Sequence, residues 1–387
     1  MPPQAVQEEP ERARAPAQAR AARLESLDVL RGLAIAGMIL VNDPGDSEHV
    51  YSQLEHALWN GLTLADLVFP AFVFVMGCSL ALALAPAVAR GAGLRALWPK
   101  ILRRTLVLMG LGLLLNLYPV FHFADARFTG VLQRIALAYA GASLIVLLRP
   151  RARDQALVAL LLVALYEGLL AFAPTPGYGP GMRTPGGNFA AYVDRGLLGP
   201  HMPLDGWDPE GILGTLPTVA TALLGALTGA WLRESSDPTR QSLGPLLAGA
   251  AGVLAGIALD RWIPINKGLW SASFVLVTGG IAMAVLGLLH DVVDLRGIRR
   301  WGFPLRVLGM NPIAIYMLSS LLATTLVSVV VTRSDGSEAT LRMLLVDAVG
   351  ALGLPPKAGS LTYAVLFVAF WTLVAAWMHR RRLFIKI

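Results

Sequence analysis

The chain has 387 residues, of which 55% are hydrophobic and only 15% are charged, and its mean hydropathy is +0.60. A soluble domain of this length has no core large enough for so much apolar side chain, so the composition excludes a soluble globular protein and predicts a polytopic membrane protein. The net charge of +7 would suit nucleic acid, but the basic residues are spread over many short loops, so we expect no nucleic-acid partner. Cys78 is the only cysteine, which excludes a disulfide framework and a cysteine metal site, and we expect no metal.

The first residues differ in composition from the rest of the chain. Residues 1–22 are rich in Ala, Arg, Glu, Gln and Pro and contain no long apolar run. This composition is not that of a signal peptide and predicts a disordered cytoplasmic tail. Residues 23–387 contain no linker and no strong internal repeat, so we expect them to form a single transmembrane domain.

Apolar segments recur along this domain and predict an all-α bundle of about ten transmembrane helices. Their centres lie near residues 35, 75, 110, 139, 164, 221, 253, 280, 317 and 369. Alternate connecting segments carry most of the 32 Lys and Arg residues, including those at both ends of the chain. The positive-inside rule therefore places both termini in the cytoplasm and turns the loop at residues 43–63 outward, in a protein of the inner (plasma) membrane.

A histidine and a carboxylate flank the outer start of the second span. His56 lies in the polar loop before this span, and Asp66 stands in its first turn. An ionisable pair at the mouth of a membrane helix favours a functional site. A neutral imidazole accepts a proton from an attacking amine or hydroxyl, while a carboxylate on its other nitrogen fixes the tautomer and stabilises the imidazolium. The alternative is that His56 is an ordinary loop residue and Asp66 an N-terminal helix cap.

The longest outward segment, residues 174–210, is rich in Gly and Pro and contains several aromatic and acidic side chains. This mixture suits a polar, sugar-like ligand, and the alternative is a flexible connector. The sequence contains no P-loop, no GxSxG elbow and no HExxH pattern, so hydrolase and nucleotidase functions lack support. The His56–Asp66 pair is, by itself, a weak indication of acyl transfer.

Several ordered motifs, from residue 26 to the C-terminus, give the chain a family resemblance. They are SLDVLRG at 26–32, HALWNGLTLADLVFP at 56–70, GVLQR at 130–134, DPEGILGT at 208–215, PINKGLWS at 264–271, GMN at 309–311 and IKI at 385–387. In these motifs the chain resembles the heparan-alpha-glucosaminide N-acetyltransferases and their bacterial relatives, within the wider group of transmembrane acyltransferases.

The resemblance implies an acetyltransferase that moves the acetyl group of cytoplasmic acetyl-CoA to the amino group of a glucosamine-type sugar on the outer, periplasmic side. It also implies that His56 is the active-site histidine, acting as base or as acyl acceptor. Whether transfer passes through an acetyl-histidine or occurs by direct attack stays open. A homodimer is compatible with the sequence.

Residues on the cytoplasmic side are candidates for binding acetyl-CoA. We expect Arg31, with Arg103 and Arg104, to hold the CoA phosphates, because a guanidinium provides a planar fork of donors for phosphate. The alternative for Arg31 is a structural ion pair with Asp28, three residues earlier on the same helix face. The candidate set for acetyl-CoA is completed by two residues nearer the outer side, Asn42 and Arg134.

Residues at the outer ends of the spans are candidates for binding the acceptor. They are Asp208 and Glu210 before the sixth span, and Asn266, Lys267 and Trp270 before the eighth. Carboxylates and amides bind a protonated amino sugar through charge-assisted hydrogen bonds, and an indole stacks on the sugar ring. The alternative for the two acids is that they cap the sixth helix, whose N-terminal dipole favours negative charge.

Two other functions use the same residues. An amino-sugar transporter (permease) would use the same cavity without chemistry, but such carriers typically have internal repeats and broken helices, which the sequence does not indicate. An O-acetyltransferase acting on an envelope glycan differs only in its acceptor.

Overall fold

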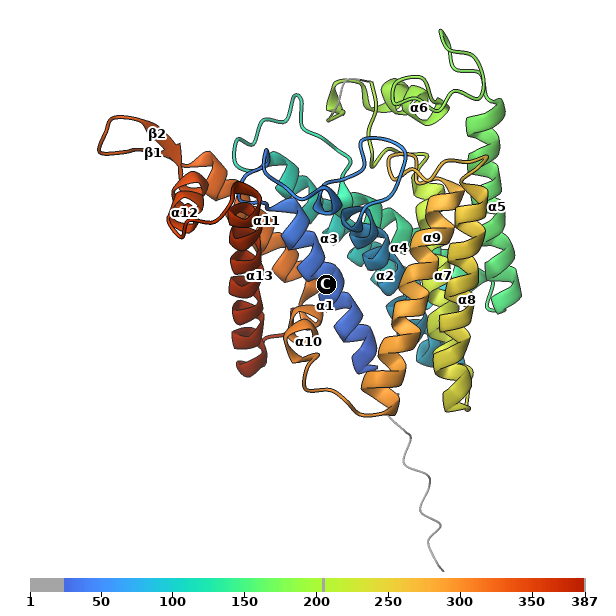
Figure 1. The fold of residues 1–387 in the computed structure, drawn as a ribbon. Helices are drawn as coiled ribbons and strands as arrows, with labels where there is room; N and C mark the ends of the chain where they lie inside the picture. The colour runs from blue at the N-terminus through green and yellow to red at the C-terminus, as the bar shows by residue number, and fades with distance from the viewer. Residues whose placement is uncertain (1–23, 204–205, 386–387) are drawn as a thin grey trace, which may run out of the picture.

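The computed structural model describes residues 24–203 and 206–385, which form an almost entirely helical bundle (Figure 1). Its helices are α1 (Glu25–Asn42), α2 (Leu64–Ala89), α3 (Leu94–Leu117), α4 (Val131–Leu148), α5 (Ala152–Phe172), α6 (Phe189–Leu198), α7 (Thr215–Glu234), α8 (Pro238–Leu259), α9 (Ala272–Leu289), α10 (Phe303–Met310), α11 (Pro312–Ser328), α12 (Leu341–Gly350) and α13 (Pro356–Arg380). Short helical turns are η1 (Ser52–Leu54), η2 (Gly199–His201) and η3 (His290–Leu295), and β1 (Val330–Thr332) pairs antiparallel with β2 (Glu338–Thr340). The predicted tail, residues 1–22, lies outside the described residues.

Seven helical segments in the described part of the chain are long and apolar enough to cross a membrane. They are α2, α4, α5, α7, α8, α9 with η3, and α13, while α10 and α11 pass the same test as a pair bent by 88°. Each of the predicted span centres falls in a helix, but α1 and α3 carry several charged side chains and are not among the seven. The prediction of an all-α membrane protein is confirmed, whereas the count of ten spans stays a prediction.

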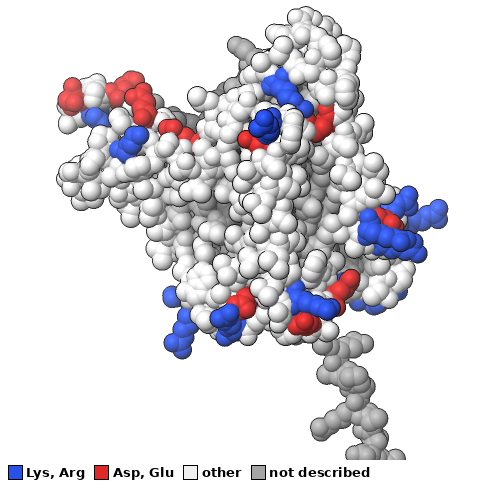
Figure 2. Space-filling view, turned by 45° about the vertical axis from the view of Figure 1, so that its right-hand side comes forward, with Lys and Arg blue, Asp and Glu red and all other residues white. Residues whose placement is uncertain are grey.

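The surface charge is distributed as expected for such a protein. On the face shown in Figure 2, charged side chains gather toward two ends of the molecule and leave a broad uncharged surface between them. An apolar belt of this kind is what a bilayer requires of the helices that it surrounds.

The beginning of α1 and the end of α13 lie at the same end of the bundle. The Glu25 carboxylate pairs with Arg306 at 2.7 Å, and the nearby Asn311 Nδ2 donates to the Leu383 carbonyl at 3.0 Å. At the opposite end, Ser360 Oγ near the start of α13 donates to the Asp46 carbonyl at 2.9 Å. We call these the Glu25 end and the His56 end. The assignment of the Glu25 end to the cytoplasm stays a prediction.

Glycines set the close packing of α2 against α7 in the centre of the bundle. A Cβ at Gly77 would lie 1.9 Å from the Ala222 carbonyl oxygen, and one at Gly225 would lie 2.0 Å from that of Phe74. Backbones approach this closely only where a side chain is absent. This contact fixes α2, and with it Asp66, in the core.

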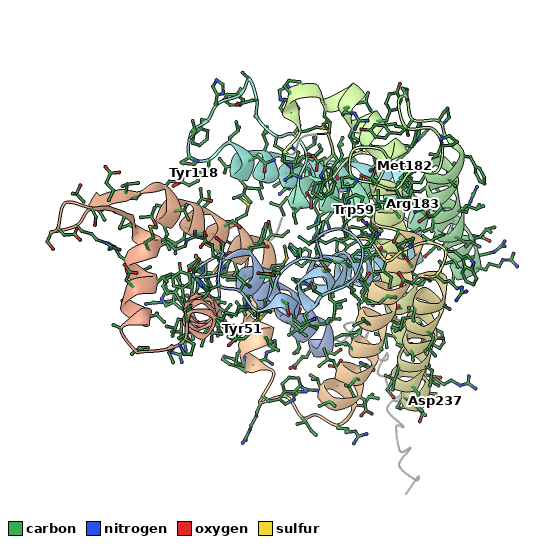
Figure 3. The ribbon with its side chains drawn as sticks, turned by 45° about the horizontal axis from the view of Figure 1, so that its top comes forward. Tyr51, Trp59, Tyr118, Met182, Arg183 and Asp237 are labelled. Atoms are coloured by element: carbon green, nitrogen blue, oxygen red, sulfur yellow. The ribbon has the colours of Figure 1, made fainter. Side chains whose placement is uncertain are left out.

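The long segment after α5 is folded over the His56 end, with α6 lying above the bundle (Figure 1). Arg183 in this segment pairs with Glu167 of α5 at 2.5 Å, and its carbonyl accepts a hydrogen bond from Trp59 Nε1 at 2.8 Å. Figure 3 shows Trp59 and Arg183 side by side. The segment is therefore attached to the loop that carries His56 and is not merely a connector.

Candidate active site

The Asp66 carboxylate organises the start of α2 and the loop before it. One oxygen, Oδ2, accepts hydrogen bonds from the backbone N–H of Thr63 and Ala57, both at 3.1 Å, and from Thr63 Oγ1 at 3.0 Å. The other, Oδ1, lies 2.8 Å from His56 Nδ1. The N-cap residue of α2 is Thr63, and Asp66 is the acid of its capping box. The Asp66 carboxylate therefore supports the start of the helix through Oδ2 and binds His56 through Oδ1, so the two interpretations from the sequence are not exclusive.

The tautomer of His56 follows from this geometry. The Asp66 side chain is fully buried, and an ionised carboxylate can only accept, so Nδ1 carries the proton that it donates to Oδ1. Nε2 then presents a lone pair that can accept a proton or attack an electrophile. Since 46% of the His56 side chain is exposed, an approaching substrate can reach this nitrogen.

Lys267 lies against the same imidazole. Its Nζ is 2.9 Å from His56 Nδ1, 3.0 Å from Nε2 and 3.5 Å from Asp66 Oδ1. An atom at nearly equal distance from both ring nitrogens must lie out of the ring plane, so the ammonium does not occupy the in-plane lone pair of Nε2. Burial lowers the pKa of Lys267, and the negative charges of Asp66 and Glu210 partly offset this effect.

A cavity of about 330 Å³ opens next to these groups at the His56 end. Its inner wall is apolar and its rim is polar and aromatic; the residues of the wall include Met38, Val41, Ala65, Val68, Phe69 and Val131, and those of the rim include Asn42, His56, Trp59, Arg127, Trp207, Glu210 and Lys267. Four of the predicted site residues therefore line one cavity, namely Asn42, His56, Glu210 and Lys267. Asp66 lies behind His56 and does not line the cavity.

Arg127 connects the acidic pair to the cavity. Its Nη2 lies 2.7 Å from Asp208 Oδ1 and 2.5 Å from Glu210 Oε2, while Thr129 Oγ1 donates to Asp208 Oδ2. Asp208 is buried and also accepts from the Glu210 N–H at 2.8 Å, so Asp208 holds Glu210 and Arg127 in place and Glu210 lines the cavity. Helix α7 begins at Thr215 after Gly214, so the acids do not cap it as the alternative interpretation supposed.

Sequence reasoning did not single out Arg127. The available signal was that Arg127 is the one Lys or Arg of the loop before the GVLQR motif, and that the next loop predicted on the same side carries the acidic DPEGILGT motif. Opposite charges in two loops of the same side are candidates for pairing, but the sequence separation of 81 residues hides the contact.

Trp59 and Trp207 form the aromatic part of the cavity in place of Trp270. Their ring centroids are 5.0 Å apart and the rings are perpendicular. Trp270 is 1% exposed, packs against Phe69, and donates from Nε1 to Thr221 Oγ1 at 3.1 Å. The expectation that Trp270 stacks on a sugar is therefore wrong, because its ring faces the core.

Asn266 also has a different role from the one expected. It is 1% exposed, its Oδ1 accepts from Leu269 N–H at 2.7 Å, and its Nδ2 donates to Asn60 Oδ1 at 3.0 Å. These bonds hold the loop of Lys267 against the loop of His56. Asn266 therefore positions Lys267 and does not line the cavity.

The candidate residues for acetyl-CoA do not form one cluster. Arg31 donates to Asp28 Oδ1, the Gly309 carbonyl and Ser79 Oγ at 2.8, 3.0 and 2.6 Å, contacts that join α1 to α10 and α2. Arg134 is 2% exposed and donates to the Gly211 carbonyl at 2.7 Å beneath the loops of the His56 end. Arg103 is exposed, and the Arg104 guanidinium lies 4.6 Å from the centre of the Tyr139 ring.

Arg31→Ala is expected to destabilise the protein by about 1–3 kcal/mol, because it removes charge-assisted hydrogen bonds between three helices. The affinity for CoA should change little. Thermal unfolding in detergent and calorimetric titration with CoA measure the two effects separately. A large loss of CoA affinity with unchanged stability would instead assign Arg31 to the phosphates, and Arg103→Ala provides the comparison variant on α3.

These features define an α-helical multi-pass membrane protein with a histidine–carboxylate pair at the mouth of a bundle cavity. No group of three or more His, Cys, Asp or Glu residues in the described ranges could hold a metal ion. The chain belongs to the family of the heparan-alpha-glucosaminide N-acetyltransferase catalytic domain, whose family model matches residues 23–244. The family inferred from the sequence motifs is therefore confirmed.

Two curated relatives carry the name heparan-alpha-glucosaminide N-acetyltransferase. The chain is 33% identical over 353 residues to the protein of Homo sapiens, in a match that covers 76% of this chain and 52% of the relative. It is 32% identical over 352 residues to the protein of Mus musculus, in a match that covers 76% of this chain and 53% of that relative. The chain thus spans about half the length of these relatives.

Proposed function

We propose that the protein is a membrane-embedded acetyltransferase that moves the acetyl group of acetyl-CoA to the amino group of a glucosamine-type sugar. The observation that carries this proposal is the His56–Asp66 pair, whose free imidazole nitrogen faces the same cavity as Glu210. Membership of the family and the printed name of the two relatives support the same reaction.

His56 Nε2 is the base in the proposed reaction. The acceptor nitrogen attacks the thioester carbonyl carbon, a C–N bond forms, and Nε2 takes the proton that the nitrogen loses. The C–S bond then breaks, and the CoA thiolate leaves as a thiol with the proton from the imidazolium. Alternatively, Nε2 attacks the thioester carbonyl carbon first, the C–S bond breaks, and CoA leaves as a thiolate. The amine then attacks the acetyl-histidine, the C–Nε2 bond breaks to restore the imidazole, and the proton that the amine loses passes to the thiolate or to solvent.

Lys267 supplies positive charge to either route. In both, the carbonyl oxygen of the acetyl group becomes negative in the transition state, next to the imidazole. The Lys267 ammonium lies within 3.0 Å of both nitrogens of that ring and outside its plane. It is therefore close enough to stabilise an oxyanion that forms beside His56.

The walls of the cavity fit the two substrates differently. The apolar inner wall between α1, α2 and α4 suits the thioester arm arriving from within the bundle. Arg103 and Arg104 on α3 are candidates for the CoA phosphates, and Arg104 Nε is buried without a hydrogen-bond partner among the described residues. With the Glu25 end in the cytoplasm of an inner-membrane protein, the acetyl group would cross to the outer, periplasmic side at His56.

The polar rim suits the acceptor. The Glu210 carboxylate offers an anionic partner to the acceptor amine, which can bind in its protonated form and loses one proton to solvent before the neutral nitrogen attacks. Trp59 and Trp207 offer faces on which a sugar ring can stack. The same rim would serve an O-acetyltransferase or an amino-sugar carrier, so the acceptor atom must be tested directly.

The test is incubation of the purified protein with acetyl-CoA radiolabelled in its acetyl group and a panel of amino sugars and neutral sugars. Label in the N-acetyl product supports the proposal, label only in ester products identifies an O-acetyltransferase, and unmodified sugar moved across proteoliposomes identifies a carrier. Release of one equivalent of CoA before acceptor is added indicates the acetyl-histidine route.

Glu210→Gln is expected to raise the acceptor KM or lower kcat/KM for the acceptor by about tenfold, because it removes a charge-assisted bond to the amine. The KM for acetyl-CoA should stay the same. Initial rates with each substrate varied in turn measure this, and Glu48→Gln, an exposed acid at the same end, is the matched control. Equal losses for both substrates, or misfolding, would count against an acceptor site at Glu210.

A further inference from the structure

A groove of about 720 Å³ lies between α5, α7 and α8, far from His56 (Figure 1). Helix α7 runs from Thr215, near the acidic pair of the His56 cavity, to Glu234, which lines the groove, so the groove is at the Glu25 end. Among the described residues, none lines both the groove and the His56 cavity. We call it the Arg153 groove.

The groove exists because α8 packs against α9 and makes little contact with α7. A Cβ at Gly249 of α8 would lie 2.4 Å from the Gly280 carbonyl oxygen of α9, and one at Gly256 would lie 2.6 Å from Val277. These glycines draw the two backbones together. The side of α8 that faces α5 and α7 is therefore left open.

The floor and walls of the groove are apolar. They are formed by Ala156 of α5, Leu227 and Ala230 of α7, Pro245 and Ala248 of α8, and Met283 of α9. The hydroxyl of Thr228, which also lines the groove, already donates to the Leu224 carbonyl at 2.8 Å. All four helices belong to segments that are long and apolar enough to cross a membrane, so hydrocarbon fills the groove in a bilayer.

The mouth of the groove, at the ends of these helices, is basic. Arg153 at the start of α5 and Arg240 in the first turn of α8 line it, with 77% and 81% of their side chains exposed. Each approaches one acid through Nε, Asp154 at 3.5 Å and Asp237 at 3.6 Å. Within the described residues neither guanidinium donates a hydrogen bond, so the outer nitrogens of both are open to a ligand.

Two further features place this mouth at the level of lipid headgroups. Trp231 lines it, is 46% exposed, and donates from Nε1 to the Arg240 carbonyl at 3.1 Å. Tryptophan is enriched where membrane helices leave the hydrocarbon. The segments 149–154 and 233–240 contain five arginines and three acids, so the mouth has a net positive charge.

We propose that the Arg153 groove binds one anionic phospholipid, with an acyl chain along the apolar walls and the phosphate between Arg153 and Arg240. A guanidinium offers phosphate a planar fork of donors, and basic pockets between membrane helices are suited to anionic headgroups. A zwitterionic lipid has the same phosphate but adds a cation to a mouth that is already positive. The site is separate from the proposed acetyltransfer and does not depend on it.

The test is thermal unfolding of the purified protein in detergent, titrated with phosphatidylglycerol or with phosphatidylcholine of the same acyl chains. In large excess, phosphatidylglycerol is expected to raise Tm by about 4 °C and phosphatidylcholine by less than about 1 °C. Arg153→Gln combined with Arg240→Gln should remove the difference. The matched control is Arg90→Gln combined with Arg95→Gln, which removes the same charge from the loop between α2 and α3 at the same end.

A groove-filling variant tests the acyl site without changing charge. Ala248→Leu places a larger side chain on the exposed wall of α8 and should also abolish the response to phosphatidylglycerol. It carries the test if the arginine variant fails to fold. Equal responses of the wild type to the two lipids, or a full response in Ala248→Leu, would overturn the proposal.

Two other occupants of the groove are distinguished by the same preparations. Inorganic phosphate should leave Tm unchanged, and a response to phosphate as large as that to the lipid would show an anion site without a lipid site. Light scattering gives the oligomeric state of each variant. If Ala248→Leu converts a dimer to a monomer, the groove is an interface between two copies of the chain and the lipid proposal fails.

Discussion

Replacing His56 by alanine is expected to lower acetyl transfer by about 10³-fold or more, because it removes the base or acyl acceptor of the reaction. The residue lies in a loop, so its loss should leave the fold and the binding of acetyl-CoA largely intact. Steady-state transfer to an amino sugar, together with acetyl-CoA binding and thermal unfolding, measures all three properties.

The chain contains a matched control for this change. His49 also pairs with an aspartate at the same end, with Nδ1 2.7 Å from Asp46 Oδ2, but it does not line the His56 cavity. His49→Ala should therefore retain transfer. Turnover of His56→Ala near the wild-type rate would refute the assignment of the active site.

Asp66 variants separate its two roles. Asparagine at position 66 still offers an oxygen to the Thr63 N–H, so it keeps the cap, but it loses the negative charge that orients and stabilises the His56 imidazolium. We expect Asp66→Asn to lose about 10²-fold in rate with little loss of stability. Asp66→Ala should lose the rate and also about 1 kcal/mol of stability, the usual cost of a lost cap.

Arg127→Ala is expected to destabilise the protein by about 3–5 kcal/mol and to abolish transfer to the acceptor, because it leaves two acids without their cation. The Asp208 side chain is fully buried, so water cannot solvate its charge after Arg127 is removed. Glu210 loses the ion pair that fixes it at the cavity. Thermal unfolding and the acceptor kcat/KM are the measurements.

Two further variants test whether the unpaired buried charge causes the destabilisation expected for Arg127→Ala. Arg127→Ala combined with Asp208→Asn should recover part of the lost stability, since the buried charge is then removed as well. Arg333→Ala breaks an exposed pair with Asp347 and should cost less than about 1 kcal/mol. Equal destabilisation by Arg127→Ala and Arg333→Ala would contradict a special role for the buried network.

The features that the sequence predicted well are local. The position of each helix follows from the length of an apolar run, and the distribution of charge between loops is a property of single segments. The His56–Asp66 pair spans ten residues and one capping box, and the Asp28–Arg31 pair spans one helical turn. Sequence spacing alone brings such residues within reach of each other.

The composition of the cavity was decided by tertiary structure. Lys267 meets His56 across 211 residues, and Arg127 meets Asp208 across 81. Both contacts join loops at the same end of the bundle, and loops carry no periodicity from which a neighbour or a facing direction can be read. Arg31 shows the same limit, because its bonds to Ser79 and the Gly309 carbonyl depend on how α1 packs against α2 and α10.

The tryptophans show most clearly the difference between what the sequence determined and what only the tertiary structure decided. The motif around residues 264–271 determined that an indole would stand at the end of a span, on the same side as His56. Trp270, however, has a positive φ of 55°, a backbone conformation that few residues of its kind adopt, and its ring lies in the core between Phe69 and Phe274. Trp59 and Trp207 come from two other loops to line the cavity. The sequence by itself determined the class of protein and the pairing of His56 with Asp66, while the direction of each loop side chain was decided only by the packing of loops against one another.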